Sequence, residues 1–296
     1  MYLLHPCADP AQLISPLQRQ DNMGTASTIG PNELSRQRLM RVIRLSKRHT
    51  GIQLPPAFVR APRLSRGVRQ PGRQDGGSEL PSTPLVSMLR GGQGGEIRLK
   101  LYLCVTLLAS HPPFDIDRPI AGRVWAEMLG LPDPEIKGAR RVADALAWLD
   151  EHKYVELQRR GGMPPRITLL NPIGDGTPYA RPTMPYIQVP IDFWEEQWIT
   201  QLSGTATALL IILLDLVGGK KRAPTQSLSP EQRRQYALSS DSWTRATAEL
   251  ADVGLIRVGR EASGPDLEWR RARNTYTVVK RRLSEPAERL TNLARP

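Results

Sequence analysis

The sequence has little cysteine, few aromatic residues and no long uninterrupted apolar run. Only two cysteines, Cys7 and Cys104, occur among 296 residues, which excludes a disulfide framework and indicates a reducing compartment. The longest apolar run, Ala208 to Val217, is interrupted by Asp215 and is too short to span a bilayer. No basic segment followed by an apolar segment begins the chain, so we expect no signal peptide and a cytoplasmic location.

Motifs of enzyme chemistry are also missing from the sequence. It has no nucleophile elbow and no clustered carboxylates, and its four histidines show no metal-ligand spacing. The glycines of Gly91–Gly95 lack the Lys-Ser/Thr that follows in a phosphate-binding loop. We therefore expect no enzyme, no cofactor, no metal and no small-molecule substrate.

Positive charge, in contrast, is abundant and unevenly distributed. The formal net charge is +12, and residues 31–75 carry eleven basic residues against Glu33 and Asp75. Such a field favours a polyanionic partner, of which nucleic acid is the first candidate. The alternative is a basic tail that serves only solubility.

The N-terminal third of the chain is predicted to lie outside the main domains. Early prolines and a lack of periodicity predict a disordered tail over residues 1–30. Residues 31–95 are expected to be a basic helix followed by a flexible linker rich in Pro, Gly, Ser and Arg. Arg41, Arg44 and Arg48 of this helix are candidates for phosphate contacts. The alternative is a solvated helix that packs on the body.

Residues 96–172 are expected to form a first domain of three helices and a hairpin. Its elements are a helix over 97–110 that is apolar nearly all round, a second helix ending at Gly130, a third beginning at Asp133-Pro134, a strand over 154–158, a loop over 159–165 and a returning strand over 166–170.

Residues 191–280 are expected to form a second domain, joined to the first by a linker over 173–190 and followed by a tail over 281–296. Its elements are an amphipathic segment over 191–202, an apolar helix from Ala206 to Val217 capped by Ser203, a helix with a capping box at Ser229-Pro230, a helix from Ser239 to Val253, and strands over 255–258 and 274–279.

The two predicted domains share an internal repeat. Leu149, Tyr154 and Val155 match Leu250, Leu255 and Ile256 position for position, which indicates a tandem duplication. The pattern from Leu250 to Ile256 with its hairpin resembles the winged-helix superfamily of DNA-binding proteins. Two copies in one chain are similar to the layout of plasmid replication initiators and of winged-helix transcriptional regulators.

The resemblance implies a mainly α fold with small β-hairpins (α+β), with two winged-helix (helix-turn-helix) domains in tandem and a disordered or helical basic N-terminal arm. It also implies DNA contacts from the third helix of each domain and from each hairpin. The helix candidates are Lys137, Arg140, Arg141, Ser242, Thr244 and Arg245. The hairpin candidates are Arg159, Arg160, Arg166, Arg260, Arg270, Arg271 and Arg273. For each of them the alternative is a solvated charge on a helix or hairpin.

We therefore predict a nucleoid-associated protein that binds double-stranded DNA, self-associates as a homodimer, and regulates transcription. The alternatives are a plasmid or chromosomal replication initiator, or a protein-interaction scaffold built on winged helices.

Overall fold

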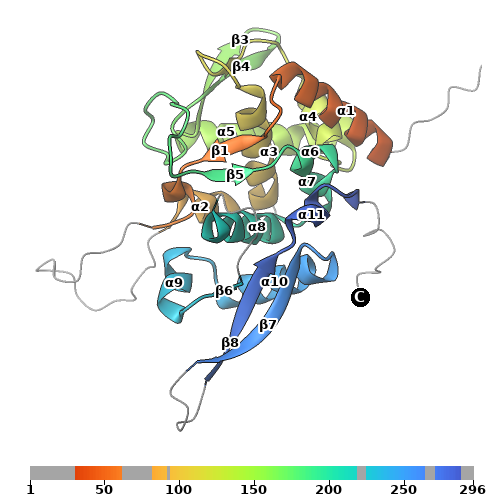
Figure 1. Cartoon of the computed structure of the whole chain (residues 1–296). Coiled ribbons are helices and arrows are strands. Elements are labelled where there is room, and N and C mark those ends of the chain that lie inside the picture. The colour runs from red at the N-terminus through yellow and green to blue at the C-terminus, as the bar shows by residue number, and fades with distance from the viewer. Residues whose placement is uncertain (1–30, 62–81, 92–93, 219–224, 264–270, 288–296) are drawn as a thin grey trace, which may run out of the picture.

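The computed structural model describes residues 31–61, 82–91, 94–218, 225–263 and 271–287, which form helices and small antiparallel sheets (Figure 1). The predicted α+β class is confirmed. None of the described helices is both long and apolar enough to cross a membrane. The predicted tail at residues 1–30, the middle of the predicted linker and residues 288–296 lie outside the described residues.

The first half of the described chain supplies the elements at the top of Figure 1. They are α1 (Pro31–Ser46), β1 (Ile52–Leu54), the 3-10 turn η1 (Pro56–Phe58), α2 (Pro84–Leu89), α3 (Gly95–Leu108), β2 (Asp115–Ile116), α4 (Gly122–Met128), the π-helical turn η3 (Pro134–Gly138), α5 (Ala139–Glu151), β3 (Val155–Arg160) and β4 (Met163–Leu169).

The second half supplies β5 (Ile187–Val189), α6 (Asp192–Glu195), α7 (Trp198–Gln201), α8 (Gly204–Val217), β6 (Gln226–Ser227), α9 (Pro230–Gln235), α10 (Ser240–Asp252), β7 (Ile256–Ser263), β8 (Arg271–Val278) and α11 (Lys280–Leu283). The predicted caps are confirmed: Ser203, Ser229 and Ser239 accept backbone hydrogen bonds at the starts of α8, α9 and α10. Gly254 has φ +74° just after α10, where a side chain would strain the backbone.

The same order of elements occurs twice. In each half a short strand and short helices precede a long apolar helix, a second short strand, two helices and a hairpin. The three-stranded sheets have the orders β2-β4-β3 and β6-β8-β7, so the second short strand pairs with the last strand in both. The repeated Leu149–Val155 and Leu250–Ile256 segments form the same helix-to-strand junction in each half.

The two halves share one core. The apolar helices α3 and α8 contact each other in the middle of the molecule, between α5 and α10 (Figure 1). Nearly every residue of both helices is buried, as expected for helices that are apolar all round. Strands β1 and β5 pair antiparallel across the same junction, with Gln53 opposite Gln188.

This junction corrects the predicted linkers. Strand β1, turn η1 and helix α2 belong to residues 51–95, and β5 belongs to residues 173–190, so these segments are ordered where flexibility was expected. Ile52, Leu54, Ile187 and Val189 are buried, which gives both short strands an apolar anchor.

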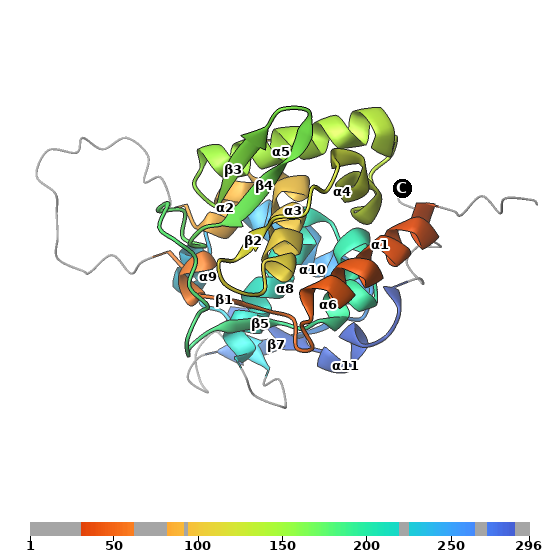
Figure 2. The same cartoon turned by 90° about the horizontal axis from the view of Figure 1, so that it is seen from above.

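The basic N-terminal helix is part of the body. It lies beside α4 in Figures 1 and 2, and Leu39, Val42 and Ile43 are buried in the core. The Arg38 Nε donates to Glu127 over 2.7 Å, and the Glu127 side chain is only 8% exposed. The helix is therefore confirmed, and it packs on the body as the alternative interpretation expected.

Both hairpins are longer than predicted. Strand β3 continues to Arg160 and β4 begins at Met163, so the turn between them is Gly161-Gly162 rather than residues 159–165. Gly162 has φ +71°, a conformation that glycine adopts without strain. Strands β7 and β8 reach Ser263 and Arg271, and residues 264–270 between them lie outside the described residues.

Candidate nucleic-acid interface

Helix α5 presents its basic residues at its N-terminal end. Asp133 accepts a hydrogen bond from the Ile136 backbone and starts the turn that leads into the helix. Lys137 and Arg140 are exposed, and neither forms an ion pair with a described residue. Arg141 is half-buried and engaged with the protein. Lys137 of η3 and Arg140 of α5 are therefore the basic residues of this segment that are free to meet an anion.

The three predicted arginines of the β3–β4 hairpin differ in their bonding partners. Arg160 donates to Asp117 over 3.0 Å, and Arg166 donates through Nε and Nη2 to Asp115, whose side chain is 12% exposed. The bonds of Arg166 join β4 to β2, and the bond of Arg160 joins β3 to the residue after β2. Hydrogen bonding to Asp115 raises the pKa of Arg166. Arg159 is exposed and has no ion pair among the described residues.

Asp115 is nearly buried, so leaving it without a cation would cost more than a new contact at an exposed site would gain, and Arg166 is therefore committed to Asp115. Asp117 is 69% exposed, so Arg160 can exchange this partner at little cost. Phosphate contact by Arg160 and Arg166 stays a prediction.

The predicted polar residues of α10 form hydrogen bonds with residues at the start of the same helix. The Ser242 hydroxyl accepts from Ser239, and the Thr244 hydroxyl donates to the Ser240 carbonyl over 2.9 Å. Arg245 donates to Asp241 over 2.7 Å, with the two side chains 70% and 77% exposed. An exposed pair one turn apart contributes only about 0.3–0.5 kcal/mol, so Arg245 can exchange Asp241 for a ligand at little cost.

The β7–β8 register divides the second hairpin into two faces. Arg260 lies opposite Asn274, on the face that continues from Val258 and the buried Tyr276. Arg273 lies opposite Glu261 on the other face. Arg271 belongs to β8, and Arg270 lies outside the described residues.

Arg257 is a further exposed cation of this hairpin that the sequence reasoning missed. It shares the face of Arg273, because Arg257 pairs with Thr277 and the side chains of a strand alternate. The strand alternation from Ile256 onward was the signal that could have identified it.

The arginines of α1 and Arg48, two residues after its end, lie in different environments. Arg41 and Arg44 are exposed and form no ion pair with a described residue. Arg48 instead donates to the carbonyls of Leu107 over 3.1 Å and Thr106 over 3.2 Å, at the C-terminal end of α3. Desolvation by burial lowers the pKa of Arg48. Arg48 thus has a structural role at the end of α3. Its predicted contact with phosphate stays a prediction.

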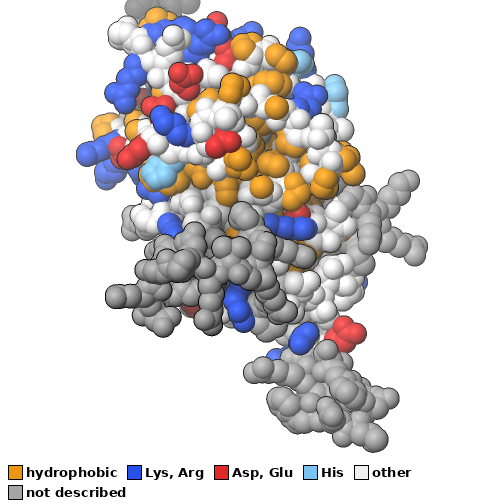
Figure 3. Space-filling view, turned by 90° about the vertical axis from the view of Figure 1, so that its left-hand side faces the viewer, with side chains coloured by type: hydrophobic (Ala, Val, Ile, Leu, Met, Phe, Trp, Pro, Cys, Tyr) orange, Lys and Arg blue, Asp and Glu red, His pale blue; other side chains and the backbone are white. Residues whose placement is uncertain are grey.

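The remaining cations form separate groups. In Figure 3, Lys and Arg side chains lie over the upper part of one face, and Asp and Glu side chains lie among them. The candidates with exposed side chains are Lys137, Arg140 and Arg159 in the first half, Thr244, Arg245, Arg257, Arg260 and Arg273 in the second, and Arg41 and Arg44 on α1. Within the described residues no group of His, Cys, Asp and Glu side chains could hold a metal ion.

Comparisons of this chain with protein-family models, with curated proteins and with solved structures find no match.

Proposed function

We propose that this protein binds double-stranded DNA through two winged-helix units and acts as a transcriptional regulator. The observation that carries the proposal is the repeated order of helix, strand, two helices and hairpin, with the first strand of each sheet beside the last. This is the arrangement expected of a winged helix, in which the helix before the hairpin enters the major groove. In both units that helix has an exposed face and a hairpin next to it.

The two units would contribute differently to binding. At equivalent positions α5 has Arg140 where α10 has Asp241, and Asp144 where α10 has Arg245. With Lys137, the N-terminal end of α5 is a cationic site suited to phosphate, which adds affinity without sequence information. On α10 the Asp241 carboxylate orients the Arg245 guanidinium, whose fork matches the O6 and N7 acceptors of guanine.

The hairpins would add contacts to the DNA backbone. Arg159 in the first unit and Arg260 in the second match in the sequence repeat and are both exposed. The first hairpin has a register shift between Gln158 and Arg160, whereas Arg260 pairs with Asn274. Arginines at such positions contact phosphates or the minor groove, and these contacts fix the orientation of the protein on the duplex.

A salt titration of duplex-DNA binding tests the proposal. Six or more phosphate contacts predict a slope of log K against log salt of about −5 or steeper. Arg140→Ala should weaken binding to all duplexes alike and reduce that slope by about 1. Arg281→Ala is the matched control, because Arg281 is 90% exposed on α11 and its loss removes the same charge. No binding at about 50 mM salt would contradict the proposal and favour a protein-interaction scaffold.

Base reading by α10 has its own test. Arg245→Ala should cost about 1–3 kcal/mol on the preferred duplex and relax the preference at one base pair. An equal loss on every duplex would show that Arg245 contacts only phosphate. Mapping of bound sites across a genome then tests the regulatory role: scattered promoters support it, and repeats beside an AT-rich origin would assign replication initiation instead.

A further inference from the structure

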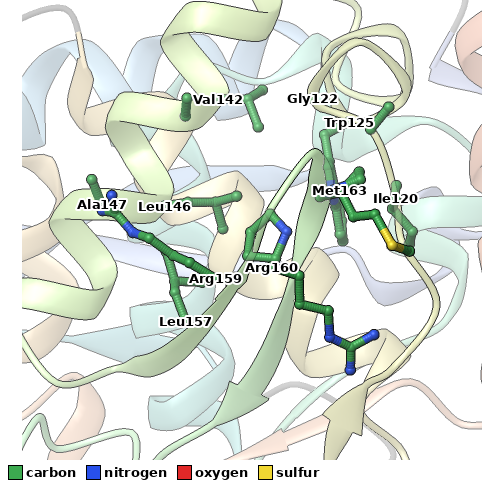
Figure 4. Close-up of a pocket in the computed structure, with 14 residues that line it drawn as sticks. Ile120, Gly122, Trp125, Val142, Leu146, Ala147, Leu157, Arg159, Arg160 and Met163 are labelled. Carbon is green, nitrogen blue, oxygen red and sulfur yellow. The ribbon is translucent and has the colours of Figure 1, made fainter.

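A cavity of about 470 Å³ lies inside the first unit, between α4, α5 and the β3–β4 hairpin (Figure 4). Its wall is mainly apolar, with Ile120 and Trp125 on one side, Val142 and Leu146 on α5, and Leu157 on the hairpin. The volume is within the range of about 300–1,000 Å³ that is typical of small-molecule sites. The cavity therefore has the size and lining of a ligand pocket.

The second unit has aromatic rings at the equivalent positions. Val142 of α5 corresponds to Trp243 of α10, counted from the repeated leucines of the two helices. Ile167 pairs with Leu157 as Tyr276 pairs with Val258.

In the second unit these rings are buried and bonded to each other. The Trp243 Nε1 donates to the Tyr276 hydroxyl over 3.0 Å, and the two ring centroids are 6.1 Å apart. Val142 lines the pocket of the first unit, and the residue at its position in the second unit, Trp243, is a buried aromatic ring. A tryptophan at position 142 would therefore fill part of the pocket.

A cation lies at the rim of the pocket. Arg159 and Arg160 both line the pocket; in Figure 4 the Arg159 side chain extends toward Ala147 of α5, whereas the Arg160 guanidinium is directed the other way. The direction of Arg160 agrees with its hydrogen bond to Asp117. Arg159 has no ion pair among the described residues, so its guanidinium is available to an anion at the rim.

We propose that this pocket binds a small monocarboxylate with an apolar body. The apolar part would be buried against Val142, Leu146 and Leu157, and the carboxylate would accept hydrogen bonds from Arg159. Arginine forms paired hydrogen bonds with carboxylates, and the apolar wall gives no compensation for a second charge. These two features together select a molecule that has one anionic end and an apolar remainder.

Such a ligand would touch both parts of the first unit that face DNA. Leu146 belongs to α5 and Leu157 to the hairpin, so a molecule between them fixes the distance from helix to hairpin. This consequence rests on the proposed DNA binding, whereas the pocket itself does not. A bound carboxylate would also neutralise Arg159 and so weaken the contact of this hairpin with phosphate.

Calorimetric titration of the full chain with decanoate tests the site without DNA. Decanoate should bind at one site per chain, and the uncharged decanamide should bind about tenfold more weakly. Arg159→Gln should weaken decanoate binding to the level of decanamide. Arg260→Gln is the matched control, because it removes the equivalent arginine of the second unit and should leave decanoate binding unchanged.

Val142→Trp introduces the side chain of the second unit and should abolish binding of both ligands. Thermal unfolding checks that each variant is folded, and Arg159→Gln, a surface change, keeps the test decisive if Val142→Trp does not fold. No decanoate binding at 1 mM to the wild-type chain, equal affinity for decanamide, or an Arg159→Gln variant that binds normally would overturn the proposal. Duplex-DNA binding measured separately, without decanoate, tests the proposed function on its own.

Discussion

Replacement of Arg48 by methionine tests the structural role of this arginine, which lies two residues after α1. Besides Leu107 and Thr106, the Arg48 guanidinium donates to the Gly51 carbonyl over 3.4 Å, and it is half-buried. Methionine keeps most of the apolar stem but leaves the last carbonyls of α3 without these donors.

The expected loss is about 2–4 kcal/mol. One hydrogen bond to a charged donor contributes about 1.5–3 kcal/mol, and a cation at a helix C-terminus adds up to about 1 kcal/mol. Water can reach part of this half-buried site and replace some of the lost hydrogen bonds, so the sum of all the contacts would overestimate the effect.

The assay is chemical denaturation of the full chain beside duplex-DNA binding. Arg44→Met is the matched control, because Arg44 is an exposed arginine in the last turn of α1, four residues before Arg48. It should change the free energy of unfolding by less than about 0.5 kcal/mol. Arg48→Met should lose stability and, once folded, bind DNA as the wild type does. Normal stability with weakened DNA binding in Arg48→Met would refute the structural role.

Three further changes test other parts of the structure. Glu249 accepts from the Ser203 backbone and hydroxyl, both over 2.6 Å, so Glu249→Gln should cost about 1–2 kcal/mol in a denaturation experiment, and Asp252→Asn on the same helix should cost nothing measurable. Burial raises the pKa of Asp215, so the stability that its protonated form contributes is present at low pH and is lost as the pH rises through the pKa of the folded state. Parallel curves of stability against pH for the wild type and Asp215→Asn would contradict this prediction. Gly162→Ala should cost about 1 kcal/mol from backbone strain alone, since a Cβ there meets no atom within 4 Å; unchanged stability would contradict the strain.

Local patterns in the sequence predicted most of the regular structure. Apolar periodicity placed α5 and α10, and serine caps placed the starts of α8, α9 and α10, because these features depend only on neighbouring residues. The repeat of Leu149–Val155 in Leu250–Ile256 predicted the equivalent junctions.

The junction between the halves could not be predicted in the same way. Strands β1 and β5 have three residues each, which is too short for an alternating pattern, and they pair over more than a hundred residues. The surrounding prolines and glycines predicted linkers, and tertiary burial of Ile52 and Ile187 overrode that preference.

The sequence predicted which segments carry the arginines of the candidate site, but it did not predict which of these arginines have partners within the protein. Arg159, Arg160 and Arg166 look alike in the sequence, and only the placement of Asp115 and Asp117 on the neighbouring segment distinguishes them. Arg48 was assigned to phosphate because its acceptors on α3 are nearly 60 residues away in the chain. The pocket is lined by Trp125, Val142 and Leu157 from three different elements, and no local pattern of the sequence indicates that these residues meet.

The most direct test of the two-unit account is photocrosslinking from the two equivalent helices. Ala143 on α5 and Thr244 on α10 occupy matching exposed positions, and each can carry a crosslinker on an introduced cysteine in a Cys7→Ser background, since Cys104 is buried. A crosslinker in place of the exposed Arg281 on α11 is the control. Both helix positions should crosslink to duplex DNA and the control should not. Crosslinking from only one helix, or equally from the control, would contradict the claim that both units bind DNA.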